Sequence, residues 1–212
     1  METNYIKSVA IATLIMTSSS VSAALLGRLA STPGGTDYQA YYDDQLDITW
    51  SAAVNINGQD TWENHMDWVS SYSIDGVTGW RLPNFDVNGD GNIISCDSSD
   101  LTVSCLDNEL TYMVRINGFY PMNTGPFSGL DLSGIYVSGT EYALDTNEVW
   151  QISLSVNRTP GSLGTSPKNY EFFNAWAVHD GDVASPVPVP TALWLFGSGF
   201  LGLIGIAMRK KT

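Results

Sequence analysis

A segment in the middle of the chain combines acidic, amide and glycine residues at the spacing of a calcium-binding loop. Asp86, Asn88 and Asp90 stand at positions 1, 3 and 5 of this pattern, with Gly91 at position 6 and Asp97 at position 12. In such loops the side chains at positions 1, 3, 5 and 12 offer oxygen atoms to Ca²⁺, and the glycine allows the sharp turn between them. The sequence therefore predicts calcium as a cofactor.

The rest of the loop follows this pattern only in part. Asn92 would add a main-chain carbonyl at position 7, and Ile94 at position 9 would leave a place for water. Asp97 is shorter than the usual closing glutamate, and Pro83 excludes an incoming helix directly before the loop. We expect weak affinity, with a Kd of about 10⁻⁴ to 10⁻³ M. An ordinary turn stabilised by Asn, Asp and Gly is the alternative.

The N-terminal segment has the features of a secretion signal. Residues 8–21 are apolar or small, follow a single early lysine, and lead to Val21-Ser22-Ala23, a site of the kind that signal peptidase cuts. A buried first helix is the alternative, but the run is short and is soon followed by Gly27 and Pro33. We expect residues 1–23 to be a signal peptide that is removed on export.

The C-terminal segment, residues 191–212, has the features of a membrane anchor. Its uncharged run from Thr191 to Met208 would form a helix about 27 Å long, enough to span a bilayer. The basic residues Arg209, Lys210 and Lys211 follow, and they predict a cytoplasmic C-terminus. The several glycines of the run favour a transmembrane helix over a core helix in water.

The segment before this anchor, residues 184–190, is a proline-rich linker that ends in Val187, Pro188, Val189 and Pro190. Together with the uncharged run and the terminal bases, it resembles the PEP-CTERM family of sorting tails. The resemblance implies transient anchoring in the inner membrane of a Gram-negative bacterium and cleavage by an exosortase-like enzyme as partner. It also implies delivery to the cell surface or the exopolysaccharide matrix. The commonest form has glutamate in place of Val189, so this tail resembles a variant subclass.

The chain has two cysteines, Cys96 and Cys105, both in the exported part. An even pair in an oxidising compartment normally forms a disulfide. Closing this short loop would stabilise the fold by roughly 2.7 kcal/mol through the entropy of the unfolded chain. A zinc site is disfavoured, because neither His65 nor His179 lies near the cysteines in sequence. We expect a disulfide-braced metal loop inserted in the domain near residues 86–105.

The charge of the exported part excludes one class of partner. Residues 25–190 contain 21 acidic and 5 basic side chains, a net charge of −16. Such a surface repels phosphates, so nucleic acid is not expected as a partner. The acidic surface fits an exported protein that holds divalent cations, and plain solubility is the alternative.

Two segments have the pattern of amphipathic helices. The first should start near Asp60 and reach about residue 72, and the second should start at Asp107 or Asn108 and end near Gly118. Their apolar faces would be Trp62, Met66 and Val69 in the first, and Leu110, Met113 and Val114 in the second.

Short strands are expected between and after these helices. Apolar and polar residues alternate at 46–50 and at 150–156, which predicts half-buried strands of an antiparallel sheet. A last strand is expected at 174–179, with Trp176 and Val178 on one face. The glycines and prolines between 155 and 171 indicate a loop.

Several motifs distributed over residues 37–183 together resemble the DUF1566 domain of secreted bacterial proteins. These motifs are Tyr41-Tyr42-Asp43-Asp44, Leu46-Asp47-Ile48-Thr49-Trp50, Gly79-Trp80-Arg81-Leu82-Pro83, Asn123-Thr124-Gly125-Pro126-Phe127, Ser138-Gly139-Thr140-Glu141-Tyr142 and Ala175-Trp176-Ala177-Val178. The resemblance implies a C-type-lectin-like α+β fold with two helices on antiparallel strands, and it brings no catalytic residues. Within it we expect Trp80 in the core and Arg81 paired with a carboxylate.

The sequence thus predicts a single α+β domain at residues 25–183, exported and secreted or held at the cell surface. We expect a non-catalytic, calcium-binding protein of the surface or matrix. The alternative is a carbohydrate-binding adhesin with a polysaccharide partner. An enzyme has less support, because the chain has two histidines and no Gly-x-Ser-x-Gly motif.

Overall fold

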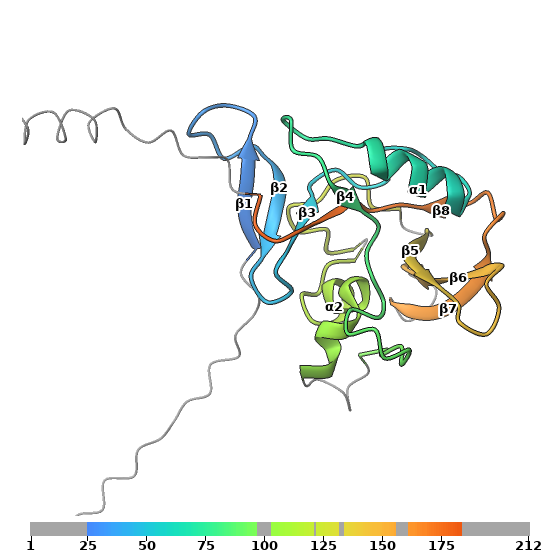
Figure 1. Cartoon of the computed structure of the whole chain (residues 1–212). Helices are drawn as coiled ribbons and strands as arrows, with labels where there is room; N and C mark the ends of the chain where they lie inside the picture. Colours follow the sequence, from blue (N-terminus) through green and yellow to red (C-terminus); the bar gives the residue numbers. More distant parts are fainter. Residues whose placement is uncertain (1–24, 97–102, 121, 132–133, 156–160, 184–212) are drawn as a thin grey trace, which may run out of the picture.

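The computed structural model describes residues 25–96, 103–120, 122–131, 134–155 and 161–183, which form a mixed α+β fold (Figure 1). The expected α+β class with two helices and antiparallel sheets is therefore confirmed. The elements in chain order are β1 (Leu25–Ala30), β2 (Tyr38–Asp43), β3 (Ile48–Ser51), α1 (Trp62–Ser71), β4 (Trp80–Arg81), the 3₁₀ helix η1 (Val103–Asp107), α2 (Glu109–Arg115), β5 (Ile135–Glu141), β6 (Glu148–Ser153), β7 (Ser162–Pro167), β8 (Phe173–Asn174) and β9 (Val178–Asp180).

The first sheet has the strand order β1-β2-β3-β9-β4, and all its pairs are antiparallel. Strand β3 lies in the middle, where Trp50 is opposite Tyr41 on one side and Val178 on the other. All four residues of β3 are buried. The alternation at 46–50 predicted the strand correctly but not its full burial, which includes the polar residues Thr49 and Ser51.

The second sheet has the strand order β7-β6-β5-β8, and only the short β5–β8 pair is parallel. Strand β7 replaces part of the loop expected between residues 155 and 171, namely residues 162–167. Each of its residues pairs with one of β6, from Ser162 opposite Ser153 to Pro167 opposite Glu148. An edge strand needs only backbone groups to pair, so β7 forms without the apolar alternation that marks a strand in sequence.

The expected last strand at 174–179 is divided between the two sheets. Phe173 and Asn174 pair in the second sheet, and Val178 to Asp180 pair in the first. Residues 175–177, which lie between the two paired segments, are buried, and Trp176 and Val178 have no exposed surface. This segment therefore connects the two sheets through the core.

Both helices begin with a side-chain cap, as their sequences predict. The hydroxyl of Thr61 accepts a hydrogen bond from the backbone N–H of Asn64 at 3.4 Å. The amide oxygen of Asn108 accepts one from the N–H of Thr111 at 3.1 Å. Because each cap satisfies a donor that the helix leaves open, these residues fix where α1 and α2 start.

Aromatic side chains fill the core on both sides of the first sheet. Trp176 contacts Trp50 and Phe127, with ring centroids 4.8 and 4.7 Å away. Trp80 is 3% exposed and packs in a second cluster with Val69 of α1, so its expected place in the core is confirmed. Trp68, which falls outside the apolar stripe of α1, is half-buried against Tyr72.

None of the helices in the described ranges is long and apolar enough to cross a bilayer. The expected signal peptide at 1–23, the linker at 184–190 and the membrane tail at 191–212 lie outside the described residues.

Helix α1 is joined to the second sheet by His65, whose side chain is fully buried. Its Nε2 lies 2.9 Å from the carbonyl oxygen of Phe173, and its Nδ1 has no hydrogen-bond partner among the described residues. Burial lowers the pKa of His65, although the Phe173 carbonyl and the charge of Asp60 act in the opposite direction. The folded protein therefore favours the neutral imidazole.

Stability should fall as the pH drops below about 6.5, the ordinary pKa of histidine in an unfolded chain. Below that pH the unfolded state binds a proton that folded His65 does not, so the slope approaches about 1.4 kcal/mol per pH unit. Urea unfolding at a series of pH values between 7.5 and 5 measures this slope of the free energy of unfolding. His65→Gln should remove this part of the slope, and His179→Gln should retain it as the matched control. Equal slopes in the wild type and His65→Gln would contradict the assignment.

Candidate metal centre

The loop after β4 is a series of tight turns closed by its own acidic and amide side chains. The two carboxylate oxygens of Asp86 accept backbone hydrogen bonds from Asp90 and Gly91, at 3.0 and 2.9 Å. Asn88 Oδ1 accepts from the N–H of Asp90, and Asp90 Oδ1 accepts from the N–H of Asn92, both at 2.8 Å. Gly91 has φ of 79°, a left-handed conformation that glycine adopts without strain.

A third carboxylate comes from Asp107, which the calcium-loop spacing of residues 86–97 does not predict. Asp107 ends η1 and is 8% exposed. Its Oδ1 accepts a hydrogen bond from the N–H of Asn88 at 2.8 Å, and its carbonyl accepts one from Val87 at 3.1 Å. One oxygen each of Asp86, Asp90 and Asp107 lies within 4.8 Å of the other two. This acidic triad can hold a metal ion, which would relieve the repulsion among the three charges.

The structure brings together some of the expected ligands. Asp86 and Asp90 converge, and Asn88 Nδ2 lies 3.4 Å from Asp90 Oδ2 at the edge of the triad. Asn92 is exposed, and Asp97 lies outside the described residues. Ile94 packs against the cluster around the cysteines, so the position expected to leave a place for water instead contributes to packing.

No spacing rule links Asp107 to the loop, because it follows on the far side of the segment between the cysteines. One sequence signal points to it: Asp107 stands two residues after Cys105 and directly before Asn108, the cap of α2. Asn108 also donates from Nδ2 to the carbonyl of Ile94 at 3.0 Å. The contacts that hold Cys105 and Asn108 beside the loop therefore also bring Asp107 to the triad.

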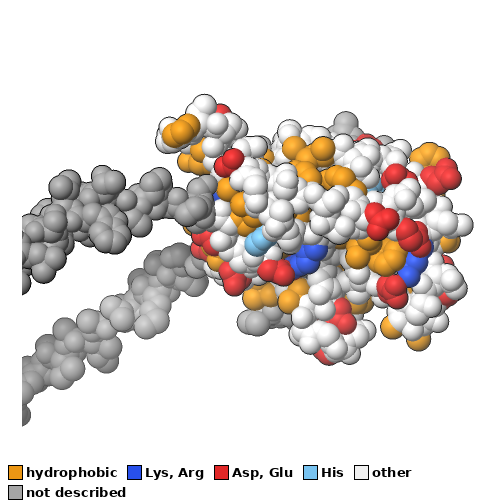
Figure 2. Space-filling view, turned by 45° about the horizontal axis from the view of Figure 1, so that its top comes forward, with side chains coloured by type: hydrophobic (Ala, Val, Ile, Leu, Met, Phe, Trp, Pro, Cys, Tyr) orange, Lys and Arg blue, Asp and Glu red, His pale blue; other side chains and the backbone are white. Residues whose placement is uncertain are grey.

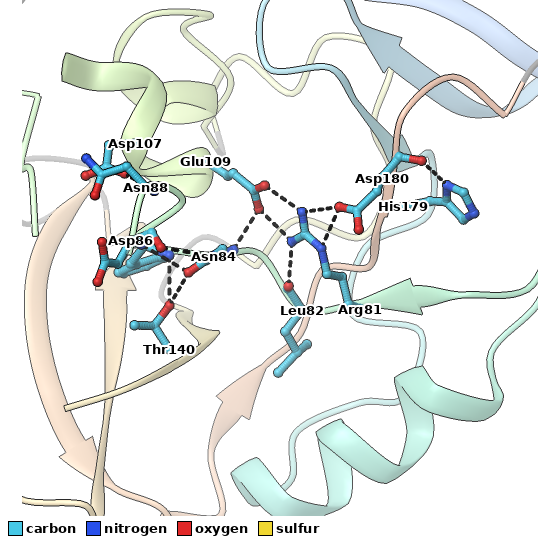
Figure 3. Close-up of polar contacts among 11 residues, drawn as sticks. Arg81, Leu82, Asn84, Asp86, Asn88, Asp107, Glu109, Thr140, His179 and Asp180 are labelled. Atoms are coloured by element: carbon cyan, nitrogen blue, oxygen red, sulfur yellow. Dashed lines mark hydrogen bonds and ion pairs between the residues drawn. The ribbon is translucent and has the colours of Figure 1, made fainter. Parts of the chain in front are cut away.

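The triad is connected to the sheets by a network around Arg81 (Figure 3). The guanidinium donates to both oxygens of Glu109, at 2.8 and 2.7 Å, to Asp180 Oδ1 at 2.8 and 2.6 Å, and to the carbonyl of Leu82 at 3.0 Å. All five of its N–H donors are therefore used. Burial alone would lower the pKa of Arg81, but the two carboxylates outweigh it and raise the pKa. The expected pairing of Arg81 with a carboxylate is confirmed.

Asn84 joins this network to the metal loop. Its backbone N–H donates to Glu109 Oε2 at 2.7 Å. Its side-chain oxygen accepts from the N–H of Asp86 at 3.0 Å and from the hydroxyl of Thr140 at 2.7 Å, and its Nδ2 donates to the carbonyl of Asp86 at 3.1 Å. Asp86 is thus held from both its N–H and its carbonyl, so its position depends on the sheets rather than on the loop alone.

Both cysteines lie beside this site. Cys96 and Cys105 are 2% and 1% exposed and belong to one small apolar cluster with Tyr112. The sulfur of Cys96 lies 3.6 Å from the carbonyl oxygen of Cys105. This proximity is compatible with the expected disulfide, which stays a prediction.

The prediction is that Cys96 and Cys105 are bonded to each other in the native protein. Alkylation of the denatured, unreduced protein should label neither thiol, and prior reduction should expose both to the reagent. Mass spectrometry of the peptides reads the result. Two alkylated cysteines in the unreduced sample would refute the bond.

Comparisons with known proteins identify no relative of this chain. A scan against protein-family models, a search of curated proteins and a search of solved structures each found no match to the chain.

Proposed function

We propose that the domain is a calcium-binding, non-catalytic module of an exported protein that acts at the cell surface or in the extracellular matrix. The observation that supports calcium binding is the convergence of Asp86, Asp90 and Asp107 within 4.8 Å. These residues come from two segments separated by the cysteine pair, and backbone N–H groups hold all three carboxylates in place.

The donor set favours calcium over other metals. The triad provides carboxylate oxygen atoms, which hard cations prefer, whereas zinc sites use sulfur or imidazole nitrogen. Magnesium requires near-ideal octahedral geometry, and a loop of consecutive turns suits the variable coordination of calcium better.

Calcium would act mainly as a structural clamp. Asp86 and Asp90 belong to the loop, and Asp107 belongs to η1 directly before α2. A cation shared among them joins the loop to the start of α2. With the millimolar affinity typical of extracellular sites, the domain would be loaded outside the cell and empty before export.

Calcium should raise the melting temperature of the protein, and chelator should reverse the effect. At free calcium 100 times above Kd the stabilisation is about 2.7 kcal/mol, or roughly 5 to 10 °C for a chain of this size. Asp90→Asn and Asp107→Asn should each remove most of the shift, because an amide keeps an oxygen for the backbone hydrogen bond but loses the charge.

The matched control is Asp67→Asn, an equal change of charge at an exposed position of α1. Its calcium-induced shift should equal that of the wild type. Equal melting temperatures of the wild type in calcium and in chelator would refute the calcium site. A full shift in Asp107→Asn would exclude Asp107 as a ligand and restrict the site to the loop.

We further propose the route that the two ends of the sequence imply. The signal peptide at 1–23 directs export, and residues 191–212 hold the protein in the inner membrane with the basic anchor on the cytoplasmic side. An exosortase-like enzyme then cuts near Val187-Pro188-Val189-Pro190 and releases the domain to the surface. The acidic surface supports this route, because a strongly charged surface suits a soluble released product. On the face in Figure 2, the basic side chains (blue) near the middle and the right both adjoin acidic ones (red).

The released protein should lack both ends. Its intact mass should correspond to a chain that begins after about residue 23 and ends near the proline motif. A mature protein that still contains Met1 would refute the signal peptide. Unchanged localisation after deletion of residues 191–212 would refute the sorting tail.

A further inference from the structure

A cavity of about 440 Å³ lies away from the metal centre, where β2, the segment after β3 and the end of α1 meet. The residues that bear on its chemistry are Tyr38, Gln39, Ile56, Tyr72, Asp75 and Ser128. It shares no lining residue with the cavity of about 500 Å³ beside Arg81 and Asp86. Its size lies in the range of sites that hold a small ligand.

The two cavities differ in whether their polar groups already have partners. Beside Arg81, the guanidinium, Glu109, Asn84 and Thr140 bond to one another. In the second cavity, Gln39 Nε2 donates to the carbonyl of Leu29 at 3.2 Å, whereas the hydroxyls of Tyr38, Tyr72 and Ser128 and the carboxylate of Asp75 make no hydrogen bond to any described residue. The polar groups of the first cavity are structural, whereas the three hydroxyls and the carboxylate of the second remain available to a ligand.

Neighbouring aromatic rings hold the two tyrosines in place. The ring of Tyr72 lies 5.0 Å from that of Trp68 and 5.7 Å from that of Trp80. The ring of Tyr38 lies 6.0 Å from that of Tyr41 in an edge-to-face arrangement. Rings that are already ordered lose little entropy on binding, and each offers an apolar body with a polar tip.

Charge decides the class of ligand. No lysine or arginine lines the cavity, and Asp75 is its charged residue. A phosphate, sulfate or other polyanion would therefore meet repulsion. A sugar ring has apolar C–H groups on its faces and hydroxyls around its edge, which suits a lining that combines two tyrosines and Ile56 with hydroxyl and carboxylate groups. We infer that this cavity binds a neutral saccharide, independently of calcium.

Binding of the full chain to immobilised hexa-N-acetylchitohexaose, cellohexaose and heparin hexasaccharide tests this inference, in millimolar calcium and in chelator. At least one neutral hexasaccharide should bind equally in both conditions, and heparin should not bind. Tyr38→Phe and Tyr72→Phe keep the rings and remove the hydroxyls, so each should weaken binding by up to about tenfold.

Ile56→Arg places a large cation in the cavity at a residue that is 50% exposed, so it should weaken binding at least about tenfold without unfolding the protein. Leu144→Arg makes the same change at an 85% exposed residue outside the cavity and should bind as the wild type does. Failure of both neutral probes, preference for heparin, loss of binding in chelator, or wild-type binding by Ile56→Arg would each overturn the inference. Because the calcium site is tested by melting alone, either result can fail without the other.

Discussion

The carboxylate of Glu109 lies inside the protein, where an ionised group is stable only if partners replace the water it has lost. Its side chain is 3% exposed, and Arg81 and the backbone of Asn84 supply those partners. Removing one partner of such a pair leaves a buried charge at a cost of about 3–5 kcal/mol. Because Arg81 belongs to the first sheet and Glu109 begins α2, this pair fixes the helix relative to the sheet and with it the place of Asp107.

The acidic triad takes its geometry from that pair. Asn84 connects Glu109 to Asp86, and Asp107 stands two residues before Glu109, so both sides of the triad are attached to the same buried charge. The backbone N–H groups that hold the carboxylates use only part of their acceptor capacity, since each carboxylate has about four lone-pair sites. The remaining lone pairs can bind a cation shared among the three carboxylates.

The two proposed sites differ in how far their polar groups are already used by the fold. Around Arg81 every donor of the guanidinium is engaged, so that region serves to position the metal loop. At the end of α1, the packing of Tyr72 between Trp68 and Trp80 orders a ring while leaving its hydroxyl available. An aromatic ring that packs only through its apolar face keeps its hydroxyl for a ligand. A polar network in which every donor is already bonded has no such group left.

The sequence by itself determined the features that depend on neighbours along the chain. Caps place the starts of α1 and α2 correctly, and the spacing of Asp86 and Asp90 predicts two members of the triad, because these patterns act within a few residues. Only the tertiary structure decided that β7 is a strand, that Glu109 and Asp180 are the partners of Arg81, and that Asp107 completes the triad. Each of these depends on segments far apart in sequence, and their contacts arise only when burial and pairing of the whole core bring them together.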